Sequence, residues 1–320
     1  MSKSLLLSIV MILGSLTAFA QETKTENKDA KPQTEATPAA QPGKVDEADQ
    51  VITNRRLRAS SGSLSKWSGN FAINYQGGSV EKPGAAQRPN ITDGADALTL
   101  QYLTANVGLR YRFNPLNSLT LGTGVFMNTP FNSSIKTNDP ALKKEFNKTK
   151  QDVTVSDPNL IYTNLARVWG FQVVTQLTPT LITNTQQRQA GYRASYDIAS
   201  TWMRDIGDFG LSGGATFEWT GYSFDKTNQG LAKNVWQLYP VLEYVINDTF
   251  NLRTLWGWQV YQQTREMAWD TYDKRVVYQS FGVGISLSRD IFLYPNIQFI
   301  PSDIRDDRTN LGISAYINTF

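Results

Sequence analysis

Seven charged residues each fall on the polar side of a run in which apolar and polar residues alternate. Alternate side chains of a β-strand point to the same face, so these seven charges would share one side of a sheet. Charges gathered on one side of a sheet either act on whatever passes that face or pair with one another and fill the space. The seven are Arg110, Arg112, Arg193, Arg253, Asp197, Glu218 and Glu243.

Other residue types offer little chemistry. Asp303, Asp306 and Asp307 form an acidic cluster that could hold Ca²⁺ or act as acid and base, but a solvated polar loop explains it better. The chain has no His and no Cys, which excludes Ser-His and Cys-His catalysis, thiolate metal sites and disulfides. We therefore expect no enzyme, and no catalytic residue, cofactor or metal ion.

The N-terminal fifth of the chain has a composition unlike the rest. Lys3, the apolar run 5–20 and the small residues Ala18 and Ala20 fit a signal peptide over residues 1–20. Residues 21–65 are rich in Lys, Glu, Thr, Gln, Ala and Pro and contain no aromatic residue. Such a segment cannot bury enough surface to offset its ordering entropy, so we expect a disordered leader, a spacer rather than a tether. Within it, only 51–58 could form a short helix or dock inside the fold.

From residue 66 onward the sequence alternates with period two, which is typical of strands with one apolar face. Trp67, Phe71, Ile73 and Tyr75, for example, are separated by polar or small residues. We expect twelve strands, near 67–75, 103–113, 119–127, 158–168, 171–182, 191–202, 209–219, 236–246, 250–258, 281–287, 291–299 and 310–320.

The connections between these runs alternate strictly between short and long. Short links rich in Asn, Asp, Gly and Pro, the residues that tight turns need, lie at 114–117, 169–170, 204–208, 247–248 and 288–290. Long polar links lie at 76–98, 128–157, 184–190, 222–234, 262–274 and 300–309. A β-sandwich does not require short and long connections to alternate, because both kinds occur at both of its ends. Membrane-spanning barrels have tight turns at one end and long loops at the other.

The character of the two strand faces agrees with a barrel in a membrane. One face is apolar and nearly free of charge, while the other carries mainly Gly, Ser, Thr, Asn and Gln. Aromatic residues gather near strand ends, as in the girdles at membrane interfaces, and the runs are long enough to cross. We therefore expect an all-β fold, a transmembrane antiparallel up-and-down β-barrel of twelve strands over residues 66–320.

This architecture resembles the bacterial outer-membrane β-barrel proteins, in particular small porin-like barrels. The last run, 310–320, ends in Phe320, which with Tyr316 is similar to the C-terminal signal read by the barrel assembly machinery. It departs from that pattern because Asn318 stands two residues before Phe320. The resemblance implies a location in the bacterial outer membrane, with lipid and the assembly machinery as partners, the leader in the periplasm and the long loops outside. A net charge of +3 gives no reason to expect nucleic-acid binding.

For such a barrel we expect a passive pore for small solutes or ions, and the slight excess of Arg among the seven charges favours anionic or neutral solutes. The alternative is a non-conducting structural or interaction barrel, including an oligomer that encloses lipid between subunits. The twelve-stranded phospholipases of this class need a Ser-His pair, which this chain lacks. Loop 128–157 would bind a surface ligand, cover the mouth or contact a neighbouring subunit.

Overall fold

The computed structural model describes residues 46–225, 232–257, 259–264, 267–268, 270–274 and 276–319. All of them belong to one compact unit that spans 45–320. The expected signal peptide, residues 21–45 of the expected leader, Trp258 and Phe320 lie outside the described residues.

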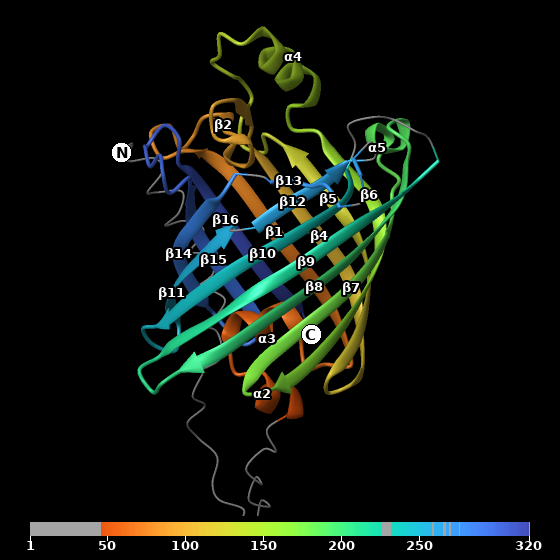
Figure 1. Ribbon diagram of the computed structural model, residues 1–320, viewed down its shortest axis with the longest axis vertical. Coiled ribbons are helices and arrows are strands. Elements are labelled where there is room, and N and C mark those ends of the chain that lie inside the picture. Colours follow the sequence, from red (N-terminus) through yellow and green to blue (C-terminus); the bar gives the residue numbers. More distant parts are fainter. Residues whose placement is uncertain are drawn as a thin grey trace, which may run out of the picture. The chain divides into compact units, whose positions relative to one another are not determined.

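The wall is a single antiparallel sheet that closes on itself, since β1 pairs with β16 and β10 pairs with β11 (Figure 1). Its strands are β1 (Trp67–Ser79), β4 (Tyr102–Asn114), β5 (Asn117–Asn128), β6 (Val153–Val168), β7 (Phe171–Leu181), β8 (Tyr192–Ile206), β9 (Leu211–Phe224), β10 (Ala232–Val245), β11 (Phe250–Gly257), β12 (Gln259–Thr264), β14 (Tyr278–Ser286), β15 (Ile291–Phe299) and β16 (Asn310–Thr319). β11 and β12 follow one another along β10, so the described residues form the twelve-stranded up-and-down barrel that the sequence predicts.

The short turns have the chemistry that their sequences predict. Trp169 and Gly170 join β6 to β7 and both have positive φ, 51° and 82°, as a two-residue hairpin turn matched to strand twist requires. Elsewhere an Asn side chain closes the turn: Asn247 accepts hydrogen bonds from the backbone N–H groups of Thr249 and Phe250, both at 2.9 Å. These turns fix the register of each hairpin and with it the face to which every side chain points.

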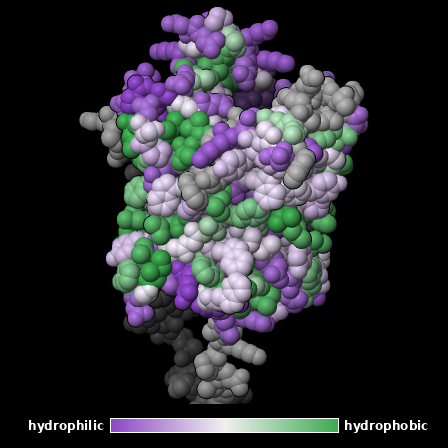
Figure 2. Space-filling model, in the orientation of Figure 1, coloured by the Kyte–Doolittle hydropathy of each residue, from purple (hydrophilic) through white to green (hydrophobic). Residues whose placement is uncertain are grey.

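The outer face of the wall is apolar. Leu121 is 65% exposed and Trp67 is 54% exposed, fractions that would be unfavourable for large apolar side chains in water. Exposed aromatic residues mark the tight-turn ends of the strands, and hydrophobic patches cover the wall in Figure 2, while the hydrophilic colour dominates at the end that carries the long loops. The exposed aromatics near the tight turns are Trp67, Phe113, Trp169, Phe209 and Phe250.

Smaller elements lie in the connections. The β1–β4 connection holds β2 (Gln87–Pro89), the 3₁₀ turn η1 (Ile91–Asp93) and β3 (Leu98–Leu100); the others are α4 (Pro140–Thr149), α5 (Thr185–Gln189) and the short β13 (Asp273–Lys274). Among the helices of the described residues, none is long and apolar enough to cross a membrane.

The structure corrects one expectation, because residues 46–65 are ordered rather than part of a disordered leader. Two helices, α2 (Glu47–Val51) and α3 (Arg55–Ser61), lie inside the wall at its tight-turn end, opposite α4 (Figure 1). The segment 51–58, singled out in the sequence as able to dock inside the fold, does so. The polar composition of this stretch is compatible with order because its hydrogen-bonding groups find partners on the wall.

Candidate functional site

The lumen gathers most of the charged residues that the sequence places on the inner face. Arg110 and Arg112 on β4, Asp197 on β8, Glu218 on β9, Glu243 on β10 and Arg253 on β11 share the inward phase of their strands. The seventh, Arg193, has the same phase along β8 as Ser195 and Asp197. It lies at the start of β8, next to a shift in register, and its guanidinium pairs with Asp225 at the long-loop rim.

A buried ion pair lies on the lumen wall. Glu243 and Arg253 are opposite one another on β10 and β11, with Arg253 Nε 2.8 Å from Glu243 Oε1 and both side chains at most 3% exposed. Asn251 donates to the other carboxylate oxygen at 3.3 Å. A buried ion pair needs such additional hydrogen bonds to offset its desolvation.

The remaining carboxylates of the lumen contact neutral groups. Thr220 donates to Asp197 at 2.6 Å and Ser195 at 3.3 Å. Gln237 donates to Glu218 at 3.4 Å. The charges of the lumen are therefore segregated: the arginines lie against the helices, and two carboxylates lie among hydroxyl and amide groups.

The two N-terminal helices, with the residues on either side, form a plug, defined here as residues 46–65. Asp46 caps α2 by accepting from the N–H of Ala48 at 2.9 Å, and Asn54 caps α3 by accepting from the N–H of Leu57 at 3.1 Å. Ala48, Ile52 and Leu57 are at most 2% exposed and pack on an apolar patch of the wall. That patch consists of Leu165, Val174, Met203 and Val241.

Polar contacts join the plug to strands around the barrel. Gln172 of β7 accepts from the backbone N–H groups of Thr53 and Asn54, both at 2.7 Å. Asn318 of β16 donates to the carbonyl of Ala59 at 2.8 Å. Arg110 of β4 donates to the carbonyl of Ser63. Because these partners belong to strands spread around the circumference, the plug is held on several sides.

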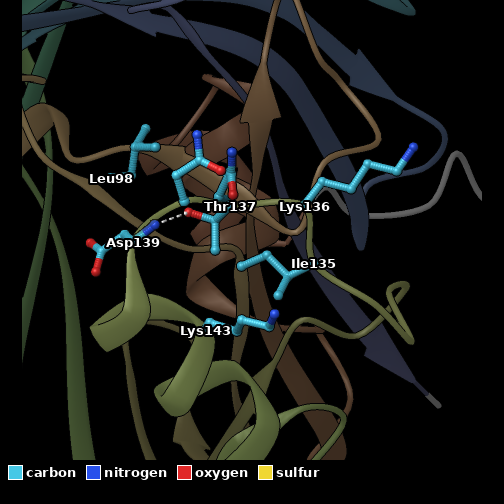
Figure 3. A pocket seen from close by; sticks show the side chains of 8 residues that line it. Leu98, Ile135, Lys136, Thr137, Asp139 and Lys143 are labelled. Carbon is cyan, nitrogen blue, oxygen red and sulfur yellow. Dashed lines mark hydrogen bonds between the residues drawn. The ribbon is translucent and has the colours of Figure 1, made fainter.

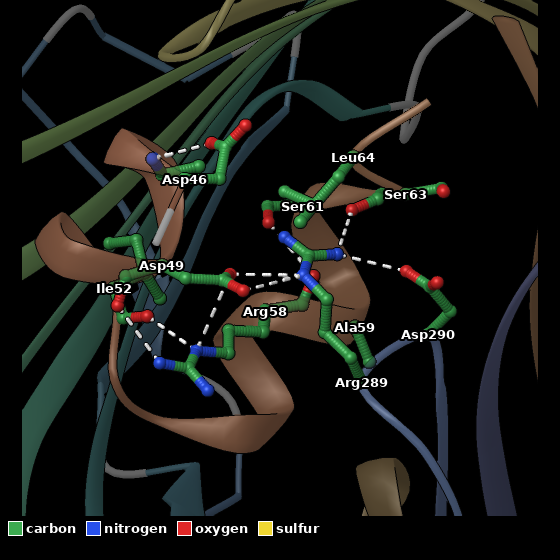
Figure 4. A network of polar contacts seen from close by, with 12 residues as sticks. Asp46, Asp49, Ile52, Arg58, Ala59, Ser61, Ser63, Leu64, Arg289 and Asp290 are labelled. Atoms are coloured by element: carbon green, nitrogen blue, oxygen red, sulfur yellow. Dashed lines mark hydrogen bonds and ion pairs between the residues drawn. The ribbon is translucent and has the colours of Figure 1, made fainter. Parts of the chain in front are cut away.

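Two carboxylates of the plug bind wall arginines. Asp46 forms a bidentate pair with Arg112, with contacts of 2.5 and 3.0 Å. Asp49 accepts from Arg289, in the β14–β15 turn, at 2.9 and 3.2 Å, and Arg58 of the plug lies 3.6 Å from the same carboxylate (Figure 4). The Asp46–Arg112 pair is bidentate, a kind of pair that is among the strongest protein hydrogen bonds, whereas the Nε–H of Arg289 is shared between the two oxygens of Asp49. Together the two anchors fix the position of α2.

The plug also reaches the buried ion pair. Asn54 donates to Glu243 Oε2 at 2.7 Å. Arg56 lies with its guanidinium 5.7 Å from the ring centroid of Tyr316 and donates to the Tyr316 hydroxyl at 3.4 Å. Tyr316, expected to form part of the C-terminal assembly signal, thus faces the lumen, and its role in assembly stays a prediction.

At the opposite end, the β1–β4 connection reaches over the mouth. Ile91 and Ala95 pack with Ile300, and Arg308 fastens the loop through an ion pair with Asp96 at 2.7 Å. Below it lies a cavity of about 300 Å³. It is lined by Thr92, Asp93, Gln237, Tyr239, Gln262, Val276 and Tyr278.

Of the expected loop 128–157, residues 129–152 form a separate structure above the wall, while Asn128 belongs to β5 and residues 153–157 to β6. Leu142 and Phe146 of α4 are buried against Ala86 and Leu100 of the β1–β4 connection. Beside them is an open pocket of about 710 Å³, where the N–H of Asp139 donates to the Thr137 hydroxyl at 3.1 Å (Figure 3). The contacts of this loop favour the expectation that it covers the mouth.

Between plug and mouth, the lumen presents polar groups that have no protein partner among the described residues. The side-chain oxygens of Asn106, Asn159 and Asn296 are buried and unpaired there. Asn106 and Asn159 flank Gly122, which adds no side chain to the inner surface. Buried polar groups are normally hydrogen-bonded, so these three oxygens are exceptions on the inner surface.

The acidic loop cluster forms ion pairs with neighbouring arginines. Asp303 lies 2.8 Å from Arg308 and 3.3 Å from Arg305, and Asp307 lies 3.5 Å from Arg305. Within the described ranges, no group of three or more Asp and Glu side chains is arranged to hold a metal ion.

Sequence reasoning missed the wall partners of the plug. Gln172 looks like any other polar residue of a strand, and Arg289 like any turn residue. One signal was available: Arg110 and Arg112 lie near a tight turn, and among the described residues no wall carboxylate forms an ion pair with them, whereas Arg289 pairs with its neighbour Asp290 at 2.9 Å. Inward cations without wall partners indicate that their partners lie inside the barrel.

Comparisons with known proteins give structural neighbours only. No family model matches the chain, and no curated protein matches it. Solved structures that align with it are outer-membrane porins and channels. They include an outer membrane channel from Pseudomonas putida F1 (11% identity, 81% of this chain and 97% of that one, TM-score 0.46). The NanC porin aligns at 10% identity over 79% and 98% of the two chains, with a TM-score of 0.41. Salmonella typhi OmpF, in complex with daunomycin, aligns at 10% identity over 81% and 98%, with a TM-score of 0.36.

Proposed function

We propose that this chain is an integral β-barrel of a bacterial outer membrane and acts as a porin-like passive pore for small solutes and ions. The observation that carries the proposal is the inversion of polarity across the wall. Leu121 points outward and is 65% exposed, while its neighbour Thr120 points inward and is 3% exposed. In lipid every backbone polar group must be paired within the protein, and a closed barrel achieves this.

The arrangement of the loops supports one orientation. Both ends of the described chain and all tight turns lie at the plug end, whereas α4 and the other long connections lie at the opposite end (Figure 1). In bacterial outer-membrane barrels the tight turns face the periplasm. We therefore place the plug and the leader on the periplasmic side and the loop 128–157 outside.

The lumen charges bear on selectivity. Arg110 and Arg112 are engaged with the plug, and Arg253 pairs with Glu243. These arginines therefore do not face free water while the plug is docked. The preference for anionic or neutral solutes belongs to a barrel from which the plug has moved. A passive pore also agrees with a chain that lacks His and Cys, since most catalytic devices need one of them.

Single-channel recording of the full chain refolded into a planar bilayer tests the proposal. We expect discrete current steps, and a reversal potential in a salt gradient that reports the ion preference. An empty-detergent control excludes leak currents. A silent membrane containing protein that is folded by circular dichroism would overturn the pore.

The second candidate is a non-conducting structural barrel, and the closure of both ends favours it. The plug occupies the tight-turn end, and the β1–β4 connection covers the mouth. Such a barrel would contribute through its loops or as an oligomer that encloses lipid. Native mass spectrometry from detergent distinguishes it, since a defined oligomer with bound lipid and no conductance supports this role.

A further inference from the structure

We propose that residues 46–65 undock from the wall as a unit, and that this undocking opens the tight-turn end of the barrel. The inference rests on the proposed function, because it treats the plug as the gate of that pore. Its basis is the contrast between how the plug is built and how the wall is built.

The plug has little structure of its own to keep it in place. α2 has five residues and α3 has seven, while isolated helices below about 12–15 residues are marginal in water. No backbone hydrogen bond of a sheet ladder joins the plug to the wall: in the described residues α2 and α3 are joined to it mainly by side chains. The wall strands, in contrast, are joined to their neighbours by antiparallel backbone ladders.

The charged contacts of the plug, unlike its buried apolar packing, are of a kind that water replaces. Asp46–Arg112 and Asp49–Arg289 are partly exposed, with the two aspartates 26% and 16% exposed. Arg55 pairs with Asp248 in the β10–β11 turn, and that carboxylate is fully exposed. Each partner can return to water when the plug leaves, so the pairs favour docking without making it permanent.

A short link with a glycine lies directly after α3. Gly62 has φ +93°, and a Cβ at this position would lie 2.6 Å from the Arg110 guanidinium. The carbonyl of Gly62 accepts from Arg289 at 2.7 Å. Residues 62–66 connect α3 to β1, so rotation about this short link moves the plug and leaves the wall paired.

Departure of the plug would change the charge of the lumen as well as its width. The plug carries Asp46 and Asp49 against wall arginines, and Asn54 against Glu243. Without it, Arg110, Arg112 and Arg289 face the tight-turn opening with no carboxylate of the plug beside them. The plug also carries Arg55, Arg56 and Arg58, so its departure removes cations as well as carboxylates and redistributes the charge of the lumen.

Two kinds of variant test the proposal, and the absence of cysteine makes thiol chemistry specific. Asp49→Asn removes one charged anchor, and Asp307→Asn is the matched control because it removes a carboxylate from an exposed ion pair in a long loop. The pair Ala59→Cys/Asn318→Cys locks the plug, since Asn318 lies within hydrogen-bonding distance of the Ala59 carbonyl. Ala59→Cys alone reports undocking, because Ala59 is fully buried while the plug is docked.

The full chain is studied in lipid bilayers and in vesicles, with current and maleimide labelling of Ala59→Cys as independent measurements. We expect Asp49→Asn to raise both the open probability and the labelling rate about tenfold, as loss of a charge-assisted hydrogen bond implies, and Asp307→Asn to change neither. We expect oxidation of the double-cysteine variant to abolish opening and reduction to restore it.

The outcomes separate the inference from the function on which it rests. Current that is unchanged by the oxidised cysteine pair would leave the pore standing and overturn the gate. Labelling that stays equally slow in Asp49→Asn would also overturn it. If labelling accelerates while no variant conducts, the proposed pore itself is overturned, and the gate with it.

Discussion

At the scale of single residues, Glu243 is the point on which most of the inner contacts converge. Its carboxylate accepts from Arg253, Asn54 and Asn251, and it is 2% exposed. Removing only Glu243 or only Arg253 leaves a buried charge without a partner. This destabilises the fold more than removing both charges does.

We therefore expect Glu243→Gln to lower the free energy of unfolding by about 3 kcal/mol. The double variant Glu243→Leu/Arg253→Met should recover part of the loss, because neither charge of the pair remains, while Asn54 and Asn251 still lose their acceptor. Denaturant titration in detergent measures both, with Glu145→Gln on exposed α4 as the matched control. A single variant as stable as the parent would contradict the structural role given to the pair.

Asp46 makes docking of the plug depend on pH. Its hydrogen bond from Arg112 lowers the pKa of this carboxyl below its usual value of 3.8, against the opposing effect of burial, with further help from the Ala48 N–H and the charge of Arg289. A pKa that is depressed in the docked state stabilises docking above the undocked pKa and loses that contribution as the pH falls through the docked value.

The labelling rate of Ala59→Cys should consequently rise as the pH is lowered from 5 to below about 4. A maleimide is poorly suited to this range, so a methanethiosulfonate or pyridyl disulfide reagent measures it, normalised to a free thiol at each pH. The same series in an Asp46→Asn background should show a weaker dependence. An identical pH profile in both backgrounds would show that Asp46 is not the responsive group.

At the scale of elements, α4 depends on two side chains for its position. Leu142 and Phe146 are its only buried residues, and they pack on the β1–β4 connection. No described residue of a wall strand takes part in this contact. The loop that carries α4 should therefore be able to open while the barrel stays folded.

Phe146→Ala should undock α4, because truncating a buried Phe costs about 3–5 kcal/mol. Amide hydrogen exchange over residues 140–149 should become fast while exchange in the wall strands and the thermal midpoint stay unchanged. Phe131→Ala is the matched control, since Phe131 lies in the same loop and is 72% exposed. Protection of α4 in the Phe146 variant would refute this assignment.

The elements also show what the sequence could and could not predict. Wall strands repeat period two over nine or more residues, and the tight turns use Asn, Asp and Gly, so each local pattern agrees with its neighbours and the barrel follows. α2 and α3 are too short for a helical period to be detected in the sequence. The partners of Asn54 are 118 and 189 residues away in the chain, and no pattern in one sequence connects positions so distant.

At the candidate site the same limit applies. Phase alone placed Arg110, Arg112, Asp197, Glu218 and the pair at 243 and 253 on the inner face. Arg193 has the same phase along β8, but phase could not predict its pairing with Asp225 next to the shift in register between Tyr192 and Ala194. Nor could it tell that the arginines bind a segment of the chain that composition alone described as disordered.

At the scale of the whole molecule, the proposed membrane barrel requires that the outer face of the wall contacts hydrocarbon. β5 offers a direct test, because Leu119, Leu121 and Val125 point outward while Ser118 and Thr120 point inward, and the chain has no native cysteine. A nitroxide attached in turn to single cysteines along 118–125, in protein reconstituted into phospholipid vesicles, reports its collision rates with dissolved oxygen and with a water-soluble nickel complex. We predict a period of two, with the odd positions open to oxygen and closed to nickel. Odd positions that collide freely with nickel would contradict a barrel embedded in lipid.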